Sequence, residues 1–257
     1  MNFVVESKNL RGSAITTELR QLGEQYDVIA SDTRRAFHGR SCETLFFCAG
    51  SHLDWRARED PNFDFRTSVN YLSYHLHEIH WRNFVLISST SVYDDPSSEE
   101  STRESLELHG HAPSTLSFHQ RTAESFVRQF APDHLIVRVP TLAGLDLDGQ
   151  PTVDGITSEA PTEFWPESEL NVLHADSMAR YVIQLLRAGV RGTFNLAATD
   201  TICGSQVEKQ LGRKLHFPTE AAGELVTPNI SIEKASAYCQ FETSGAAFAP
   251  FEQRKAG

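Results

Sequence analysis

The chain has 257 residues, 40% of them hydrophobic and 22% charged, a composition that supports a substantial core and argues against disorder. Its formal net charge of −11 argues against nucleic acid or an anionic membrane as the main partner, since both are negatively charged. No apolar stretch approaches the ~20 residues of a membrane-spanning helix, and the first ten residues predict neither a signal peptide nor an anchor.

Strands and helices alternate along the first 140 residues. The apolar runs predict strands over 2–5, 27–30, 44–48, 84–87 and 135–139, and helices over 13–22, 63–80 and 114–130. Apolar strands joined by helices indicate parallel pairing, because a parallel pair needs a long crossover. The fold class expected is α/β, a doubly wound parallel sheet of Rossmann type.

After Gly144 the alternation loosens. Residues 146–166 predict a loop, followed by a helix at 175–187, a strand at 193–196 and helices near 205–211 and 231–238. This part is too small for an independent domain. We therefore expect residues 1–144 to form a Rossmann-like core, and residues 145–257 to supply its remaining elements and a small C-terminal cap in one structural unit.

The cysteines and histidines predict no metal site. The cysteines lack metal-ligand spacing, which favours a reduced, cytoplasmic protein; they are Cys42, Cys48, Cys203 and Cys239. His77 and His80 lie three residues apart, but a solvated helix or one at an interface explains them without a metal.

Polar and glycine residues follow two of the predicted strands. Ala49 and Gly50 end one strand, and Ser88, Ser89 and Thr90 end the next. Ligands of a doubly wound sheet bind beyond the carboxyl ends of its strands. The sequence therefore predicts a pocket for a small molecule at this edge.

Several segments, in matching order, resemble the extended short-chain dehydrogenases/reductases, which include NAD-dependent epimerases and dehydratases. The resembling segments are ISSTSVY at 87–93, Asp60-Pro61 with Val69-Asn70, Ala123-Glu124, VRVP at 137–140 with Gly144, HADSMA at 174–179, GTFN at 192–195 and Ser231–Lys234. Together they span nearly the whole chain. The resemblance implies a Rossmann fold, a bound NAD or NADP, and catalysis by a serine, a tyrosine and a lysine.

The phosphate-binding loop departs from the family pattern. The glycines of the family's GxxGxxG fall on Glu6, Asn9 and Gly12, so that only the third is kept. The first two let the backbone approach the pyrophosphate at a helix N-terminus, and a β-carbon obstructs that approach. Lys8 and Arg11 could offset part of this loss by neutralising phosphate. We expect weakened or lost binding of the dinucleotide.

The resemblance also implies a cofactor site after the second strand. Asp32 falls where the family's acidic residue accepts hydrogen bonds from the ribose hydroxyls, which favours NAD over NADP. The nearby Arg34 and Arg35 make this preference less clear. The alternative is that Asp32 only caps a turn. About a dozen residues separate Asp32 from the next strand, so the family's third strand and helix are predicted to be lost or reduced to a loop. The remaining positions expected beside the cofactor are Ala49, Gly50, Ser88 and Pro140.

The catalytic tyrosine and lysine of the family align on Leu116 and Gln120. Leucine has no proton to give and glutamine carries no charge, so the usual redox chemistry is not supported. His119 is a candidate for a relocated proton donor. The predicted helix register turns it away from the face that Leu116 and Gln120 share, and a surface histidine is the alternative.

Four residues are expected to contact the substrate. They are Ser89, Thr90, Tyr93 and Gln120. Ser89 matches the family's serine and is also a candidate catalytic group, although it cannot act alone as a base. Tyr93 matches a structural tyrosine of the family, and a role as a substitute proton donor is the second interpretation.

These departures favour a ligand-binding pseudoenzyme or a non-redox derivative of the family. The alternative is an active NAD(P)-dependent epimerase, dehydratase or reductase acting on a small polyol or nucleotide-sugar-like substrate. The helices at 63–80 and 114–130 correspond to those that form the family's dimer interface. We therefore expect a homodimer, or a heterodimer with an active paralogue, and no nucleic-acid or membrane partner.

Overall fold

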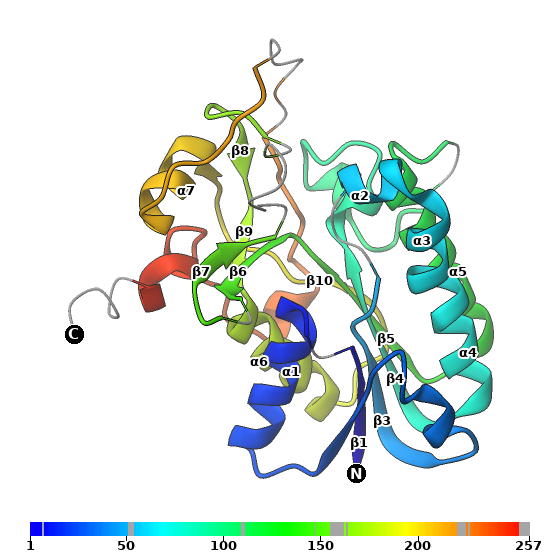
Figure 1. The fold of residues 1–257 in the computed structure, drawn as a ribbon. Coiled ribbons are helices and arrows are strands. Elements are labelled where there is room, and N and C mark those ends of the chain that lie inside the picture. Colours follow the sequence, from blue (N-terminus) through cyan, green and yellow to red (C-terminus); the bar gives the residue numbers. More distant parts are fainter. Residues whose placement is uncertain are drawn as a thin grey trace.

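The computed structural model describes residues 1–6, 8–50, 54–108, 111–146, 148–154, 162, 164–219, 225 and 227–251. Its centre is a parallel sheet of six strands in the order β10-β5-β4-β3-β1-β2 (Figure 1). The strands are β1 (Asn2–Val5), β2 (Tyr26–Ile29), β3 (Ser41–Phe47), β4 (His80–Ser89), β5 (His134–Val139) and β10 (Gly192–Asn195). The predicted Rossmann-type α/β fold is confirmed.

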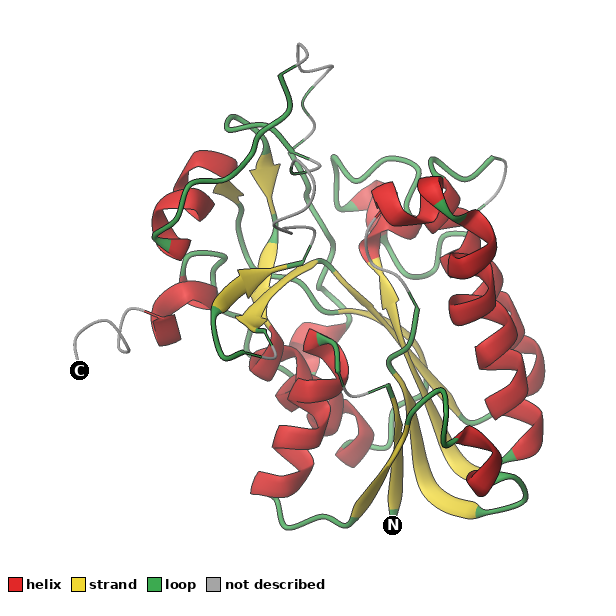
Figure 2. Ribbon diagram, in the orientation of Figure 1, coloured by secondary structure: helices red, strands yellow, loops and turns green. Residues whose placement is uncertain are grey.

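Helices cover both faces of this sheet (Figure 2). On one face lie α1 (Leu10–Gln21) and α6 (Ala175–Arg187). On the other lie α4 (Tyr71–Glu78) and α5 (Thr115–Phe130). Alternate strand residues supply the two cores: Val4 and Phe46 pack toward the first pair, and Phe47 toward the second.

The predicted helix at 63–80 is three consecutive segments. These are α3 (Pro61–Phe65), a π-helical turn (Arg66–Asn70) and α4. Asp60 caps the first of them by accepting a hydrogen bond from the Phe63 amide. The short helix α2 (Asp54–Glu59), which the sequence did not predict, precedes them.

The sheet ends at β2. The segment between β2 and β3, all of it described, forms only a short 3-10 helix, η1 (Arg34–Phe37). This agrees with the predicted loss of a strand and a helix. Val5 pairs with Ile29 of β2 and with Phe47 of β3, so the carboxyl ends of three strands lie together at one edge.

The C-terminal part adds α6 and β10 to the core and builds a small cap. The cap's elements are β6 (Thr141–Leu145), β7 (Pro151–Val153), β8 (Glu169–Leu170), β9 (Val172–His174), β11 (Ile202–Cys203) and α7 (Gly204–Leu211). Phe164 and Phe248 lie in its separate hydrophobic core. In the described part of the chain, no helix combines the length and apolar composition required to cross a membrane.

Two sequence predictions for this part are wrong in detail. The predicted loop 146–166 contains β7, although residues 147, 155–161 and 163 lie outside the described part. The predicted helix at 231–238 is reduced to a 3-10 turn, η5 (Ala235–Ala237). Within this stretch the Ser236 amide donates to the Ile232 carbonyl and the Cys239 amide to the Ala235 carbonyl, which makes isolated turns rather than a continuous helix.

Candidate functional site

A cavity of about 660 Å³ lies at the carboxyl ends of β1, β2 and β3. Its walls come from the strand ends, from the start of η1 and from the helices that follow β3. The lining residues are Glu6, Ser31, Arg34, Ala49, Gly50, Arg56, Phe63, Arg66, Thr67, Asn70, Tyr71 and Tyr74. Of the predicted cofactor residues, the structure brings Ala49 and Gly50 together here.

Glu6, directly after β1, is in the left-handed region with φ of +63°. Only glycine adopts this conformation without strain, because the β-carbon of other residues approaches the following carbonyl oxygen. This is the position at which the family resemblance places a glycine. Glu6 thus has a backbone conformation typical of glycine, and its carboxylate lines the cavity at this point.

Replacing Glu6 by glycine is expected to stabilise the protein. The left-handed strain of about 1–2 kcal/mol is relieved, and the greater freedom of glycine in the unfolded chain offsets about half of the gain. Urea unfolding should show Glu6→Gly about 0.5–1 kcal/mol more stable than Glu6→Ala, which removes the same carboxylate but keeps the β-carbon. Equal stability of the two variants would contradict strain at this position.

Asn9 caps the N-terminus of α1. Its side-chain oxygen accepts a hydrogen bond of 2.8 Å from the Gly12 amide, and its Nδ2 donates to the Cys48 carbonyl at 2.7 Å. Asn9 is extended, with φ of −104°, so it does not use the left-handed conformation open to asparagine. The Asn9 side chain thus occupies the Gly12 amide at this helix end.

Arg11 is turned to a protein partner. Its side chain is 3% exposed, and its Nη2 lies 2.9 Å from Oδ2 of Asp154, which follows β7. Burial lowers the pKa of Arg11, and the attraction of Asp154 offsets part of that shift. Because its guanidinium is buried against Asp154, the predicted role of Arg11 in neutralising phosphate does not fit the structure.

At the end of β2 the charge facing the cavity is positive. Ser31 and Arg34 line the cavity, whereas Asp32 between them is an exposed turn residue that the lining does not include. The Arg34 guanidinium lies over the ring of Tyr71 at 5.3 Å and over that of Tyr74 at 5.8 Å. Both tyrosines come from α4 and were not predicted at this site.

The hydroxyls at the end of β4 and directly after it divide between two environments. The Ser88 side chain is buried and donates a 2.7 Å hydrogen bond to Oε1 of Glu124 on α5. Ser88 therefore belongs to an interior network rather than to the predicted cofactor site. Ser89 and Thr90 are half-buried, with the Ser89 hydroxyl accepting from the Ser91 amide at the start of η3 (Thr90–Val92). Pro140 is buried between β5 and β6.

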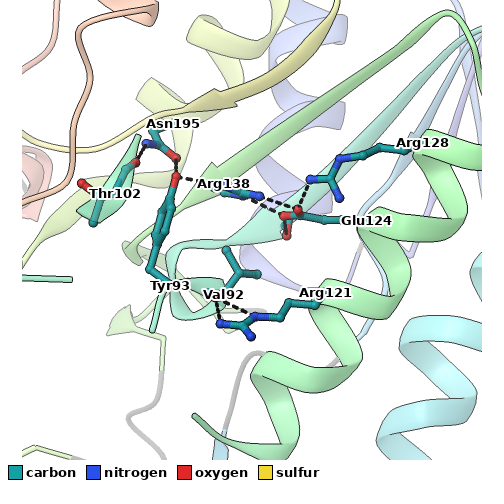
Figure 3. A network of polar contacts seen from close by, with 9 residues as sticks. Val92, Tyr93, Thr102, Arg121, Glu124, Arg128, Arg138 and Asn195 are labelled. Atoms are coloured by element: carbon teal, nitrogen blue, oxygen red, sulfur yellow. Dashed lines mark hydrogen bonds and ion pairs between the residues drawn. The ribbon is translucent and has the colours of Figure 1, made fainter. Parts of the chain in front are cut away.

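A buried network joins α5, β5, β10 and Tyr93, which follows η3 (Figure 3). Arg138 donates to Glu124 through Nε at 3.0 Å and through Nη2 at 2.7 Å, a bidentate pair. Arg138 also donates to the Tyr93 hydroxyl, which in turn donates to Oδ1 of Asn195 at 2.7 Å. Burial raises the pKa of Tyr93, and Arg138 offsets part of that shift. Tyr93 is thus a buried structural residue and does not line the cavity.

The face of α5 on which the sequence resemblance places the catalytic pair is buried. Leu116 is 4% and Gln120 is 3% exposed. The expectation of a surface histidine at position 119 is wrong: His119 is 5% exposed, and its Nδ1 lies 2.5 Å from Oδ2 of Asp64 on α3. The other Asp64 oxygen accepts from the hydroxyl of Ser68 in the π-helical turn. His119 therefore connects α5 to the helix segment that lines the cavity.

The two histidines considered for a metal lie on different elements. His77 is on α4, where its Nδ1 contacts the Ser73 carbonyl, and His80 begins β4. Within the ranges that the structure describes, no group of three or more histidine, cysteine, aspartate or glutamate side chains is placed to hold a metal ion.

Comparison with solved structures identifies the architecture. MoeE5, in complex with UDP-glucose and NAD, superposes with a TM-score of 0.74 at 15% identity, covering 100% of this chain and 99% of that chain. The fold is one shared with nucleotide-sugar enzymes. A UDP-glucuronic acid 4-epimerase variant from Bacillus cereus, bound to NAD and a fluorinated sugar nucleotide, gives 0.71 at 14% identity with coverage of 100% and 99%. The NADP complex of dTDP-4-dehydrorhamnose reductase from Bacillus anthracis str. Ames gives 0.70 at 11%, with coverage of 98% and 97%.

The sequence itself matches no protein-family profile and no curated protein. Identities of 11–15% across nearly complete chains show that the fold is shared while most side chains differ. What this chain binds and catalyses must therefore be argued from its own residues.

Proposed function

We propose that this protein is a member of the extended short-chain dehydrogenases/reductases that binds a small-molecule ligand without the family's usual redox chemistry. The observation that carries the proposal is the pair Leu116 and Gln120 on α5. Both are buried, the sequence resemblance aligns them with the family's catalytic tyrosine and lysine, and neither can donate a proton at neutral pH.

The cofactor loop supports the same proposal. Glu6 places a strained, carboxylate-bearing residue where the pyrophosphate approaches, and Asn9 occupies the helix end. Neither the altered loop nor the altered pair on α5 would decide the question alone, since a loosened loop or a substituted donor can be tolerated. The two losses together favour a pseudoenzyme or a non-redox derivative.

One observation favours an active enzyme as the alternative. The carboxylate of Asp64 orients the His119 ring, an arrangement that resembles the base and orienting acid of many enzymes. His119 would then be the relocated proton donor of an NAD(P)-dependent epimerase, dehydratase or reductase. In that case His119→Gln abolishes turnover while the protein remains folded.

Calorimetric titration with NAD⁺, NADH, NADP⁺, NADPH and UDP-glucose separates these functions. We expect dissociation constants above about 1 mM for the four dinucleotides, against the micromolar values typical of enzyme ligands. We also expect no change in nicotinamide absorbance when protein and substrate are mixed. Micromolar dinucleotide binding together with turnover would overturn the proposal and establish the alternative.

A homodimer through α4 and α5 is part of the same proposal, with a heterodimer with an active paralogue as the alternative. Phe118 and Phe130 on α5 are 54% and 47% exposed, although both are large and apolar. Sedimentation velocity of the purified chain distinguishes a dimer from a monomer that needs a different partner.

A further inference from the structure

The outer edge of β2 carries unpaired backbone groups. β2 pairs with β1 alone, and that ladder ends where the Glu6 amide donates to the Ile29 carbonyl. Because successive residues of a strand point their N–H and C=O groups to opposite sides, those of Tyr26 and Val28 point away from β1. In the part of the chain that the structure describes, the N–H and C=O groups of these two residues have no hydrogen-bond partner.

The opposite edge of the sheet, formed by β10, is closed by charged side chains. The Lys234 Nζ donates to the outward Thr193 carbonyl at 2.6 Å. The Glu104 carboxylate accepts from the outward Asn195 amide at 2.8 Å. Such contacts keep a further strand from pairing. Among the described residues no side chain binds the outward backbone groups of β2 in this way, and Val28 is 36% exposed. The sheet can therefore continue only past β2.

The elements beside β2 cover the faces of the sheet and leave its edge open. Phe37 of η1 packs on Phe3 of β1, with ring centres 5.1 Å apart. On the other face Tyr26 packs against the core under α1. Directly after β2 the backbone turns: the Ala30 amide donates to the Thr33 hydroxyl, and the Ala30 carbonyl accepts from the Thr33 amide. The open part of the edge is thus β2 itself.

The open groups match a second copy of the same strand. In an antiparallel pair about a two-fold axis at Asp27, Tyr26 of each copy lies opposite Val28 of the other. Every outward N–H of one copy then meets an outward C=O of the other. An axis at Val28 would instead place Tyr26 opposite Ala30. The Ala30 amide and carbonyl are already bound to Thr33, so the axis at Asp27 is the favoured register.

The side chains on both faces fit this register. On one face each Tyr26 lies beside a Val28, and an aromatic residue with a β-branched one is a favourable cross-strand pair. On the other face the two Asp27 carboxylates meet near the axis. Arg40 Nη2 lies 3.0 Å from Asp27 Oδ2 within each copy, and these side chains are 41% and 39% exposed. Each Arg40 therefore brings a cation to the axis, and the paired charges of the two copies balance.

We propose that β2 is an interface at which two copies of this chain pair antiparallel and join their six-stranded sheets into one. This goes beyond the proposed function and rests neither on it nor on a dimer through α4 and α5. The contact of two short strands is small, and interfaces below about 1,200 Å² are typical of weak association. The interface should therefore form at high protein concentration, with a dissociation constant in the range of roughly 1 μM to 1 mM.

A disulfide at Asp27→Cys tests the register on the full chain. Directly opposite residues of a non-hydrogen-bonded antiparallel pair have Cα atoms about 4.5 Å apart, within the ~4.4–6.8 Å that a disulfide spans. Asp27→Cys should therefore form a covalent dimer under mild oxidation. Val28→Cys is the matched control, because the two Val28 residues are diagonal neighbours about 7–8 Å apart and should not be linked. The unaltered chain controls for the native cysteines, of which Cys42 and Cys203 are half-buried.

Val28→Pro, added to Asp27→Cys, removes one outward donor from each copy. The ladder with β1 does not use this N–H, so proline is compatible with the folded chain. The cross-linked fraction should fall about tenfold, because the pairing loses hydrogen bonds that water replaces only in the separate chains. Val28→Ala, which also shortens the side chain but keeps the N–H, should leave the cross-linked fraction within about twofold of Asp27→Cys alone. Thermal unfolding checks that both variants are folded.

The cross-linking pattern decides the proposal. Covalent dimers of Asp27→Cys that are absent from Val28→Cys and lost with Val28→Pro support the interface. No cross-link, equal cross-linking of the two cysteine variants, or a cross-link that a folded Val28→Pro variant leaves unchanged overturns it. A dimer through α4 and α5 alone gives no such cross-link, because Asp27 lies on β2. The experiment uses no ligand, so its failure is separate from a failure of the proposed function.

Discussion

Replacing Arg138 by methionine should destabilise the protein by about 3–5 kcal/mol at pH 7, the cost of removing the buried, bidentate partner of a buried carboxylate. Glu124 is 0% and Arg138 is 1% exposed, so water cannot replace the lost hydrogen bonds. Tyr93 also loses a donor to its hydroxyl. Chemical denaturation of the two proteins measures the difference.

Arg128→Met is the matched control for this experiment. Arg128 pairs with the same carboxylate at 2.6 Å, but its side chain is 44% exposed. Exposed ion pairs contribute about 0–1 kcal/mol, so the control should lose no more than that. Equal losses in Arg138→Met and Arg128→Met would show that burial of the pair does not determine its contribution.

The effect of Arg138→Met should depend on pH. In the folded protein burial raises the pKa of Glu124, but the attraction of Arg138 more than offsets this and leaves the pKa below its usual value. The ionised pair therefore contributes stability above the unfolded pKa of about 4.3, and this is lost as pH falls through the lower folded value. In Arg138→Met the Glu124 carboxyl can become protonated and lose its charge. The loss of unfolding free energy caused by the substitution should therefore shrink from pH 7 toward pH 4, close to the ordinary glutamate pKa of ~4.3.

Gly50→Ala should cost about 2–4 kcal/mol, the sum of backbone strain and overpacking. Gly50 has φ of +106°, and an added β-carbon would lie 2.7 Å from the Ser68 hydroxyl oxygen and 3.4 Å from the Ser68 Cα. Ser68 cannot move freely, because its hydroxyl donates to Asp64. The substitution should also lower the affinity of the cavity for any ligand, since Ser68 belongs to the π-helical turn that lines the cavity.

Gly39→Ala separates the two causes. Gly39 also has a positive φ, +71°, but nothing lies within 4 Å of its added β-carbon. It should therefore lose only the strain contribution, about 1–2 kcal/mol. Thermal unfolding of both variants, with nucleotide titration alongside, makes the comparison. If Gly39→Ala loses as much stability as Gly50→Ala, the clash with Ser68 is unimportant.

The sequence predicted the sheet because each strand is an apolar run bounded by polar or glycine residues. Val4 and Phe47 lie in strands that are buried on both faces, which the alternation of strands and helices anticipates. The loss of a strand after Asp32 followed from the shortness of that segment compared with the family pattern. These features are local, and so a sequence expresses them directly.

Side-chain partners far apart in the chain were not predictable in the same way. His119 and Asp64 are 55 residues apart, and their contact depends on how α5 and α3 rotate against each other. Arg11 likewise pairs with Asp154 of the cap, and the sequence did not predict how the chain runs in that region.

The shortened sheet has a consequence for dynamics. β2 is the edge strand, bonded on one side only to β1, and the residues after it, Ser31 and Arg34, form one wall of the cavity. Edge segments open locally at lower free energy than central strands, so this wall belongs to the part of the sheet that unfolds most readily. A ligand held by Ser31 and Arg34 binds only the closed form and therefore anchors the edge. Occupancy of the cavity and order at the end of the sheet are thus linked, and amide hydrogen exchange in β2 reports on both.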